Sequence, residues 1–122
     1  MTIQATESVS AVRPFTIAVS DAELADLRAR LEKTRFPPTP ADAEWRYGTA
    51  RPFMEKVVDH WINRYDWRAA ERRLNRFPHF IANVDGYDIH YIHVRGSGPR
   101  PMPLILTHGW PGSFVEFDDV IE

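Results

Sequence analysis

The first half of the chain places its apolar residues at the spacing of amphipathic helices. Residues 20–23, Ser-Asp-Ala-Glu, form a capping box, in which the Ser20 hydroxyl and the Glu23 carboxylate each accept a backbone N–H. The next residues put three leucines on one helical face: Leu24, Leu27 and Leu31. We therefore expect a helix over residues 21–33, ended by the prolines of residues 36–40, which lack a backbone donor.

Two further helices are predicted before Pro78. The second begins near Pro52, because proline suits the first helical turn, and its apolar residues recur in steps of four: Phe53, Val57, Trp61 and Tyr65. Asp66 can cap the third helix, whose inward-facing residues are Trp67, Ala70 and Leu74. Residues 1–13 are polar and small and are expected to fray, and residues 42–49 are expected to be irregular.

The hydrophobic period changes from 3.6 to 2 after Pro78. Residues 80–84 and 87–94 are rich in aromatic and β-branched side chains, and Asp85-Gly86 between them predicts a type I′ hairpin turn. Residues 95–103 form a Gly/Pro loop. The continuously apolar residues 104–107 predict a strand buried on both faces. Residues 114–122 begin a helical pattern.

Composition narrows the class of protein. With 122 residues and 43% hydrophobic content, the chain can form one small domain with a core. A net charge of -2 argues against nucleic acid or an anionic membrane as the main partner. The absence of cysteine excludes a disulfide framework, a thiolate metal site and a cysteine nucleophile. No signal peptide and no membrane span is visible, so a cytoplasmic protein is expected.

Residues 108–113, His-Gly-Trp-Pro-Gly-Ser, form a loop whose composition suits chemistry. Gly109 allows the backbone to approach a reacting atom closely, and Pro111 fixes its own φ and removes a competing donor. The backbone N–H of Trp110 could then point at a developing negative charge, as in an oxyanion hole. Taken alone, the same residues suit an ordinary strand-to-helix turn equally well.

The segments before this loop resemble, in order and spacing, the N-terminal part of the microsomal-type epoxide hydrolases. The resemblance runs from about Arg13 to the last residue. It rests on residues 13–15 (Arg-Pro-Phe), 31–37 (Leu-Glu-Lys-Thr-Arg-Phe-Pro), 65–68 (Tyr-Asp-Trp-Arg), 74–75 (Leu-Asn), 88–94 (Asp-Ile-His-Tyr-Ile-His-Val) and 104–113. Phe36 is a small departure, because the family more often has tryptophan there.

This resemblance implies an α/β fold class, namely the N-terminal part of an α/β-hydrolase with an incomplete sheet. We expect a flexible N-terminus at residues 1–12, a helical meander at residues 13–78, and the start of the hydrolase core at residues 79–122. That core would comprise a β-hairpin, a further strand and the oxyanion-hole loop. As in the family, the Trp110–Pro111 bond is expected to be cis.

The resemblance also implies a reaction. Family members open an epoxide by attack of an aspartate, and a histidine paired with a carboxylate then activates water to cleave the enzyme ester. No cofactor or metal is needed, and the partners are a small epoxide and water. On this chain the donor would be the Trp110 N–H, with His108, Gly109 and Pro111 shaping the loop.

No nucleophile, acid or base is identifiable in these residues. We therefore expect the chain to stop before the nucleophile and to be inactive alone. We also expect it to be poorly soluble or partly unfolded, because the strand at residues 104–107 would lack its neighbour.

The histidines are interpreted as structural. His108 could be mistaken for a base that pairs with Asp118 or Asp119, but the family base lies near the end of a complete chain, so His108 is expected to brace the loop. On a strand, His90 and His93 point to opposite faces. His60 and His79 lie alone on separate elements, so no zinc site is predicted.

Two other groups of side chains also have structural interpretations. The arginines spaced by four favour a solvated helix face over an anion-binding stripe: Arg64, Arg68, Arg72 and Arg76. The tryptophans of the helical region favour a core over base-stacking platforms: Trp45, Trp61 and Trp67.

Two other functions stay open at this point. A haloalkane dehalogenase or a serine esterase would share the loop, although such enzymes usually lack the long helical lead-in. A short binding or regulatory module could instead assemble with a separate catalytic chain. An in-frame continuation that carries an aspartate elbow would exclude the module.

Overall fold

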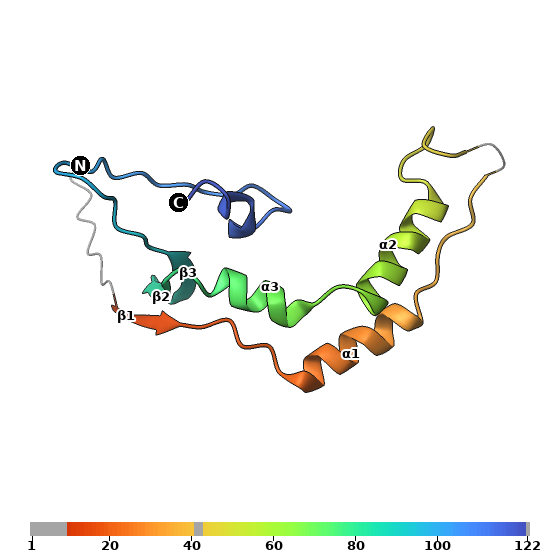
Figure 1. Ribbon diagram of the computed structural model, residues 1–122, viewed down its shortest axis with the longest axis horizontal. Coiled ribbons are helices and arrows are strands. Elements are labelled where there is room, and N and C mark those ends of the chain that lie inside the picture. Colours follow the sequence, from red (N-terminus) through yellow and green to blue (C-terminus); the bar gives the residue numbers. More distant parts are fainter. Residues whose placement is uncertain (1–9, 41–42, 122) are drawn as a thin grey trace. The chain divides into compact units, whose positions relative to one another are not determined.

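The computed structural model describes residues 10–40 and 43–121 (Figure 1). Its elements in chain order are β1 (Ser10–Phe15), α1 (Asp21–Glu32), α2 (Arg51–Asn63), α3 (Trp67–Leu74), β2 (His79–Val84), β3 (Tyr87–Ile92) and the 3₁₀ turn η1 (Phe114–Phe117). The chain divides into two units. Residues 18–68 form a helical unit, and residues 10–17 with residues 69–121 form a unit built on the sheet. The domain boundaries predicted at residues 12 and 78 stay a prediction.

The first helix begins with the capping box that the sequence predicts. The Ser20 hydroxyl accepts the Glu23 N–H at 3.2 Å, and the Glu23 carboxylate accepts the Ser20 N–H at 2.9 Å. The Ser20 backbone N–H and, secondly, the Ser20 hydroxyl donate to the Glu23 carboxylate, and these two hydrogen bonds hold its pKa below the usual value. The helix over residues 21–33 is therefore confirmed, with Lys33 as its C-cap. The start of the second helix near Pro52 is confirmed too.

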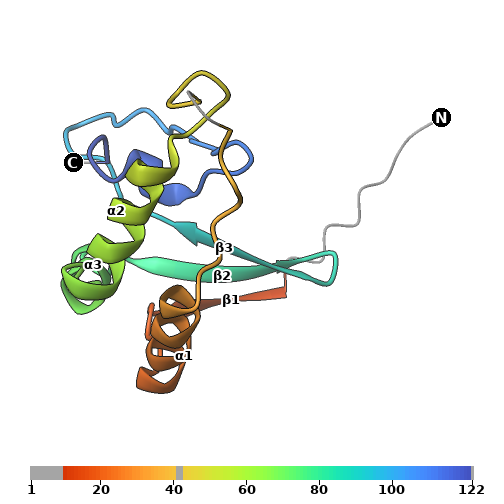
Figure 2. The same ribbon diagram turned by 90° about the vertical axis from the view of Figure 1, so that its right-hand side faces the viewer.

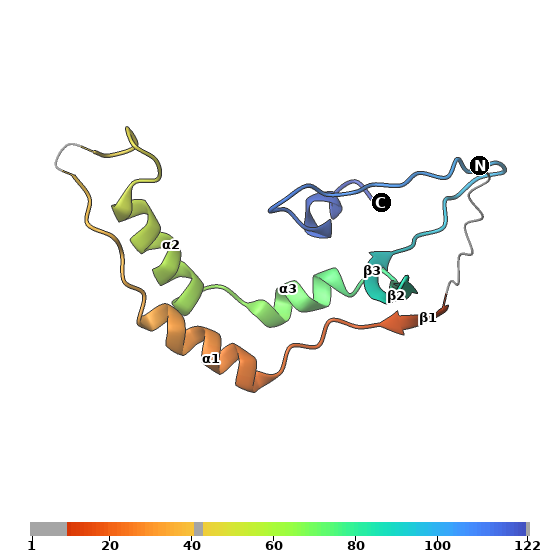
Figure 3. The ribbon, with the colours of Figure 1, turned by 180° about the vertical axis from the view of Figure 1, so that it is seen from behind.

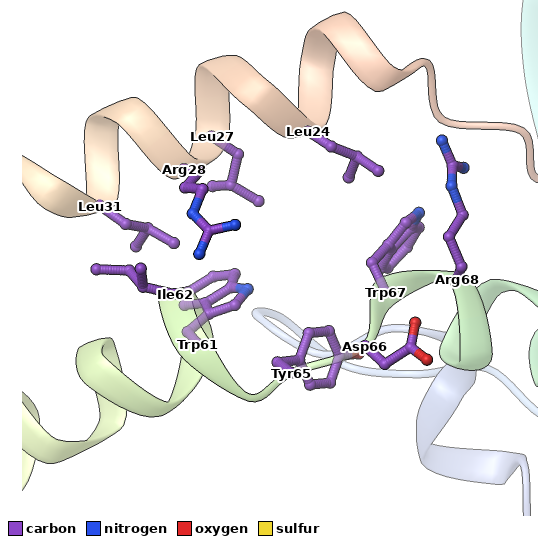
Figure 4. Close-up of a pocket in the computed structure, with 10 residues that line it drawn as sticks. All are labelled: Leu24, Leu27, Arg28, Leu31, Trp61, Ile62, Tyr65, Asp66, Trp67 and Arg68. Carbon is purple, nitrogen blue, oxygen red and sulfur yellow. The ribbon is translucent and has the colours of Figure 1, made fainter.

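Helices α1 and α2 lie side by side in the helical unit (Figure 3). The leucines of α1 are half-buried, and they point toward Trp61, Ile62 and Trp67 (Figure 4). Other apolar residues of this unit are exposed: Trp45, Phe53, Val57, Trp61 and Tyr65. The prediction that Trp45 and Trp61 are core residues is therefore wrong for this structure, whereas Trp67 is half-buried. Two helices can bury one shared seam, and their other sides stay open within the unit.

The second unit is built on an antiparallel sheet with the strand order β1-β2-β3 (Figure 2). Phe15 pairs with His79 and Arg13 with Ile81, and the register is irregular between Ser10 and Arg13. The sequence analysis missed β1, because it expected residues 1–13 to fray; the part before Ser10 lies outside the described residues. Pro14 is tolerated here because β1 is an edge strand.

The hairpin between β2 and β3 is confirmed. Both turn residues have a positive φ, 51° at Asp85 and 87° at Gly86, as a type I′ turn requires. The Asn83 side chain accepts the Gly86 N–H at 3.1 Å and donates to Asp88 at 3.0 Å, which ties the turn to the start of β3. Asp88 also pairs with Arg13, so the hairpin end is linked to β1.

Residues 104–107 form no strand in the structure, so that prediction is wrong here. The segment is irregular and exposed, with Ile105 89% accessible. A strand needs a neighbour to pair its backbone groups, and among the described residues the ladders join only β1, β2 and β3. The helix predicted from residue 114 is a single 3₁₀ turn, η1. No helix in the described ranges is long and apolar enough to cross a membrane.

Candidate functional site

The 108–113 loop closes on itself through a tight turn. The Gly112 N–H donates to the Gly109 carbonyl at 2.7 Å. The Trp110–Pro111 bond is cis, as the family resemblance implied, and it places Pro111 at the third position of a type VI turn. His108 Nδ1 lies 3.2 Å from the Gly109 carbonyl oxygen, so its side chain contacts the loop itself. In the described part of the chain no hydrogen bond joins His108 to Asp118 or Asp119.

Trp110 stands at the tip of this turn and is 98% exposed. No hydrogen bond within the described residues uses its backbone N–H. Gly112 is packed much more tightly, because a Cβ there would overlap the Glu116 carboxylate and lie 2.9 Å from the Gly109 carbonyl oxygen. At Gly109 a Cβ would meet nothing within 4 Å. The loop therefore needs a glycine at position 112 to close, and it leaves the Trp110 N–H open.

The loop leads directly into η1. Ser113 is the N-cap, and its hydroxyl accepts the Val115 N–H at 3.3 Å. Phe114, the first residue of η1, packs against two histidines of the sheet. The downstream end of the loop is thus attached to the sheet unit, while the upstream residues 104–107 are exposed.

The two histidines form a hydrogen-bonded pair. His79 is only 3% exposed, its Nε2 lies 2.9 Å from the Leu74 carbonyl oxygen, and its Nδ1 lies 2.9 Å from His90 Nε2. A carbonyl can only accept, so in the neutral pair His79 carries its proton on Nε2 and accepts the His90 Nε2–H. The ring planes differ by 17° and the centroids are 5.1 Å apart. Because a centroid separation of 5.1 Å is close to the largest that a 2.9 Å contact between ring nitrogens allows, the rings lie end to end in nearly one plane rather than face to face.

The sequence analysis treated His79 as isolated, and that was wrong. The hairpin register pairs His79 with Ile92 and Ile81 with His90, which puts both histidines on one face of the sheet. The register could have been predicted from the sequence, because a two-residue turn at Asp85-Gly86 fixes which residues of the two strands oppose each other. Burial, and secondly the neighbouring His79, lowers the pKa of His90.

A second cluster holds the far end of η1. Asp118 is 4% exposed, and its carboxylate lies 3.3 Å from Arg73 and 3.5 Å from Arg76. Arg76 also donates to the Asp118 carbonyl at 3.0 Å.

Arg68 donates to the Val19 carbonyl at 2.8 Å and pairs with Asp21. The prediction of a solvated arginine face is therefore wrong for half-buried Arg68, whereas Arg64, Arg72 and Arg76 are exposed, although Arg76 also contacts Asp118.

The helical unit has grooves of its own. One, of about 230 Å³, lies between α1 and residues 61–68 and is lined mostly by apolar side chains (Figure 4). A second, of about 380 Å³, includes His60 among apolar residues. In the ranges that the structure covers, no three histidine, aspartate or glutamate side chains converge as a metal site would require. His60 and His93 are exposed.

A helical lead-in, a β-hairpin and the 108–113 loop follow each other as at the beginning of an α/β-hydrolase, and the solved structures that match agree. The fold is similar to that of the Aspergillus niger epoxide hydrolase, with a TM-score of 0.82 and 31% identity, over 92% of this chain and 30% of that chain. It is also similar to the juvenile hormone epoxide hydrolase of Bombyx mori, with a TM-score of 0.76 and 30% identity, over 91% of this chain and 30% of that one.

The family model described as epoxide hydrolase N terminus matches residues 12–117. The chain belongs to the epoxide hydrolase family and represents its N-terminal region. It is 41% identical to epoxide hydrolase 1 of Sus scrofa over 114 residues, which is 90% of this chain and 25% of that protein. It is 43% identical to a putative epoxide hydrolase of Stigmatella aurantiaca, over 87% of this chain and 24% of that protein. The chain thus spans about a quarter of the length of these relatives.

Proposed function

We propose that this chain is the N-terminal part of an enzyme that adds water to an epoxide to give a diol. Its own contribution to the chemistry is the 108–113 loop, which supplies one donor of the oxyanion hole. The observation that carries this proposal is the Trp110 backbone N–H, which has no hydrogen-bond partner among the described residues. It is presented at the tip of a turn that glycine closes and proline shapes.

The chemistry needs such a donor in its second step. A carboxylate from outside these residues attacks an epoxide carbon, the C–O bond breaks, and an ester to the enzyme forms. Activated water then adds to the ester carbonyl, and the negative charge that collects on that oxygen must be stabilised. A donor held in place beforehand does this without reorganisation, which is why its loss typically costs on the order of 10²–10³ in rate.

The neighbouring residues have supporting roles in this proposal. Gly109 leaves open space on the side of the turn where a substrate would approach, since no atom lies within 4 Å of its missing Cβ. His108 braces the turn through the Gly109 carbonyl. The nucleophile, acid and base come from other parts of the enzyme, so the 122-residue chain alone is inactive.

The proposal is tested with a chimera in which this chain replaces the matching N-terminal region of Sus scrofa epoxide hydrolase 1, which is 41% identical to it. The chimera is assayed for conversion of styrene oxide to its diol, alongside the intact parent, the parent without its N-terminal region, and the purified chain. We expect diol from the chimera and the parent but not from the two incomplete proteins. A folded chimera without activity, or diol formation by the chain alone, would contradict the proposal.

A further inference from the structure

The residues that follow the 108–113 loop rest on two imidazoles that the proposed chemistry does not use. The Phe114 ring meets His79 at a centroid distance of 5.5 Å and an angle of 79°, and His90 at 5.2 Å and 63°. One aromatic ring therefore stands edge-on against both members of the pair. Because the two imidazoles lie nearly in one plane, they present a single flat surface to Phe114.

Hydrogen bonds fix the orientation of that surface. Leu74 at the end of α3 accepts from His79, which in turn accepts from His90 on β3, so three elements are linked in one chain of donors and acceptors. Imidazole side chains rotate readily about χ2 unless their nitrogens are paired. Here both nitrogens of His79 are used and Nε2 of His90 is used. The surface can therefore hold only one orientation while the bridge is intact.

We propose that the His79–His90 pair is a positioning device for the 108–113 loop, which it holds in place by seating Phe114 on the bridged rings. This inference rests on the proposed function, because it explains how the Trp110 N–H is kept in position before the charge develops. In this chain the loop is attached on its downstream side through Phe114, whereas residues 104–107 on its upstream side are exposed and irregular.

The surroundings of the pair favour this role over that of a titrating acid or base. Phe15 of β1 packs edge-on against His90, at 5.2 Å and 68°, so two aromatic rings contact this half-buried imidazole. The charged side chains on the same face of the strands are Arg13 and Asp88, and these pair with each other at 3.0 Å. The pair therefore positions Phe114 through its hydrogen bonds, which hold the two rings nearly in one plane.

Hydrogen–deuterium exchange of the full 122-residue chain at pH 7, read on peptides covering residues 113–121, tests the inference without requiring catalysis. His90→Leu removes the donor and leaves His79 Nδ1 buried without a partner, so exchange in this segment should rise about tenfold. In His90→Gln the side-chain amide can still donate to His79, and exchange should stay near that of the unaltered chain. His93→Gln is the matched control, because His93 is exposed beside the same strand.

A ¹⁵N spectrum of the histidine side chains shows which ring nitrogen carries the proton, and ring packing alone would not change that. The unaltered chain should show both His79 and His90 protonated at Nε2, and His90→Gln should leave the His79 pattern as it was. Peptides over β2 and the start of β3 should keep their exchange rates in every variant, because the inference concerns the seat of Phe114 and not the sheet.

Equal exchange of residues 113–121 in all four proteins would overturn the inference. So would a wild-type segment that exchanges as fast as an unstructured peptide, because nothing would then be seated. Loss of protection in His90→Gln equal to that in His90→Leu would show that ring packing, and not the bridge, is responsible. An inactive chimera with a normal exchange pattern would instead contradict the proposed function alone.

Discussion

Arg76 donates from Nη2 to the backbone carbonyl of Asp118 at 3.0 Å and lies 3.5 Å from the carboxylate of the same residue. Arg73 approaches that carboxylate to 3.3 Å. The carboxylate oxygens of Asp118 are buried, and no direct hydrogen bond reaches them in the described residues. The positive charges of these two arginines therefore offset the cost of burying the carboxylate. The contact attaches the end of η1 to α3. Its strength can therefore be measured as the protection of residues 113–121 from hydrogen exchange.

Replacing the buried charge should loosen that attachment. Asp118→Asn keeps the shape but removes the negative charge that faces both arginines, and we expect a loss of about 1–3 kcal/mol in local stability. The measurement is hydrogen exchange over residues 113–121 in the chain. Asp119→Asn is the matched control, because Asp119 is exposed next to it and should change nothing. Equal exchange in the two variants would show that the ion pairs contribute nothing.

Acid should weaken the sheet unit in a defined pH window. The pKa of His90 lies below its ordinary value of 6.5, chiefly because of burial, so the unfolded chain binds more protons than the folded one at mildly acid pH. Stability from this group is complete above about pH 6.5 and falls as the pH drops toward the depressed folded pKa. Urea unfolding followed by circular dichroism between pH 7.5 and 5 checks this, and His90→Gln should flatten the curve.

The exposed carboxylates with lowered pKa values act in a separate and more acidic window. Hydrogen bonds from Asn83 and then Arg13 lower the pKa of Asp88, and those from Ser20 lower that of Glu23. Their contributions are present above the unfolded pKa values and are lost only as the pH falls through the folded ones, below about pH 4. A fall in stability that began only below pH 4.5 would therefore contradict the role given to His90.

The two glycines of the 108–113 loop should respond differently to alanine. Gly112→Ala puts a Cβ against the Glu116 carboxylate and 2.9 Å from the Gly109 carbonyl oxygen, so the turn must open. Gly109→Ala meets nothing within 4 Å and should leave the turn closed. Amide chemical shifts of residues 108–116 should move widely in the first variant and only near the substitution in the second. Similar spectra for both variants would mean that the turn is not closed as described.

Half-buried Arg68 should matter more than the exposed arginines of the helical region. Its hydrogen bond to the Val19 carbonyl is partly buried, whereas its pairing with exposed Asp21 adds little. Arg68→Met should therefore cost about 1–2 kcal/mol of stability in the helical unit. Arg72→Met, at an exposed position of the same helix, should cost less than about 0.5 kcal/mol. Urea unfolding followed by circular dichroism compares the two, and equal midpoints would remove the role assigned to Arg68.

Local signals were enough to predict the elements that depend on local chemistry. The capping box at Ser20, the proline near the start of α2 and the Asp85-Gly86 turn each specify a backbone geometry within a few residues, and each is found where it was predicted. The loop at residues 108–113 was located from its composition, whereas its cis bond was expected from the family resemblance and is confirmed. Its role in catalysis stays a prediction.

The errors concern features that depend on distant partners. Strand β1 forms because β2 offers it an edge, which nothing near Pro14 reveals. The apolar run at residues 104–107 has strand composition but no paired neighbour in the structure. The His79–His90 pair follows from the hairpin register, which could have been worked out from the turn. The contact of Asp118 with Arg76 spans 42 positions and has no local signal.

The proposed function depends above all on stabilisation of charge by the backbone N–H of Trp110 during epoxide hydrolysis. The most direct measurement is kcat for styrene oxide in the chimera carrying Trp110→Pro, which removes the N–H, against Trp110→Phe, which keeps it. We expect kcat to fall about 10²–10³-fold for Trp110→Pro and less than about fivefold for Trp110→Phe. Equal losses in the two variants, both folded as judged by circular dichroism, would contradict the claim.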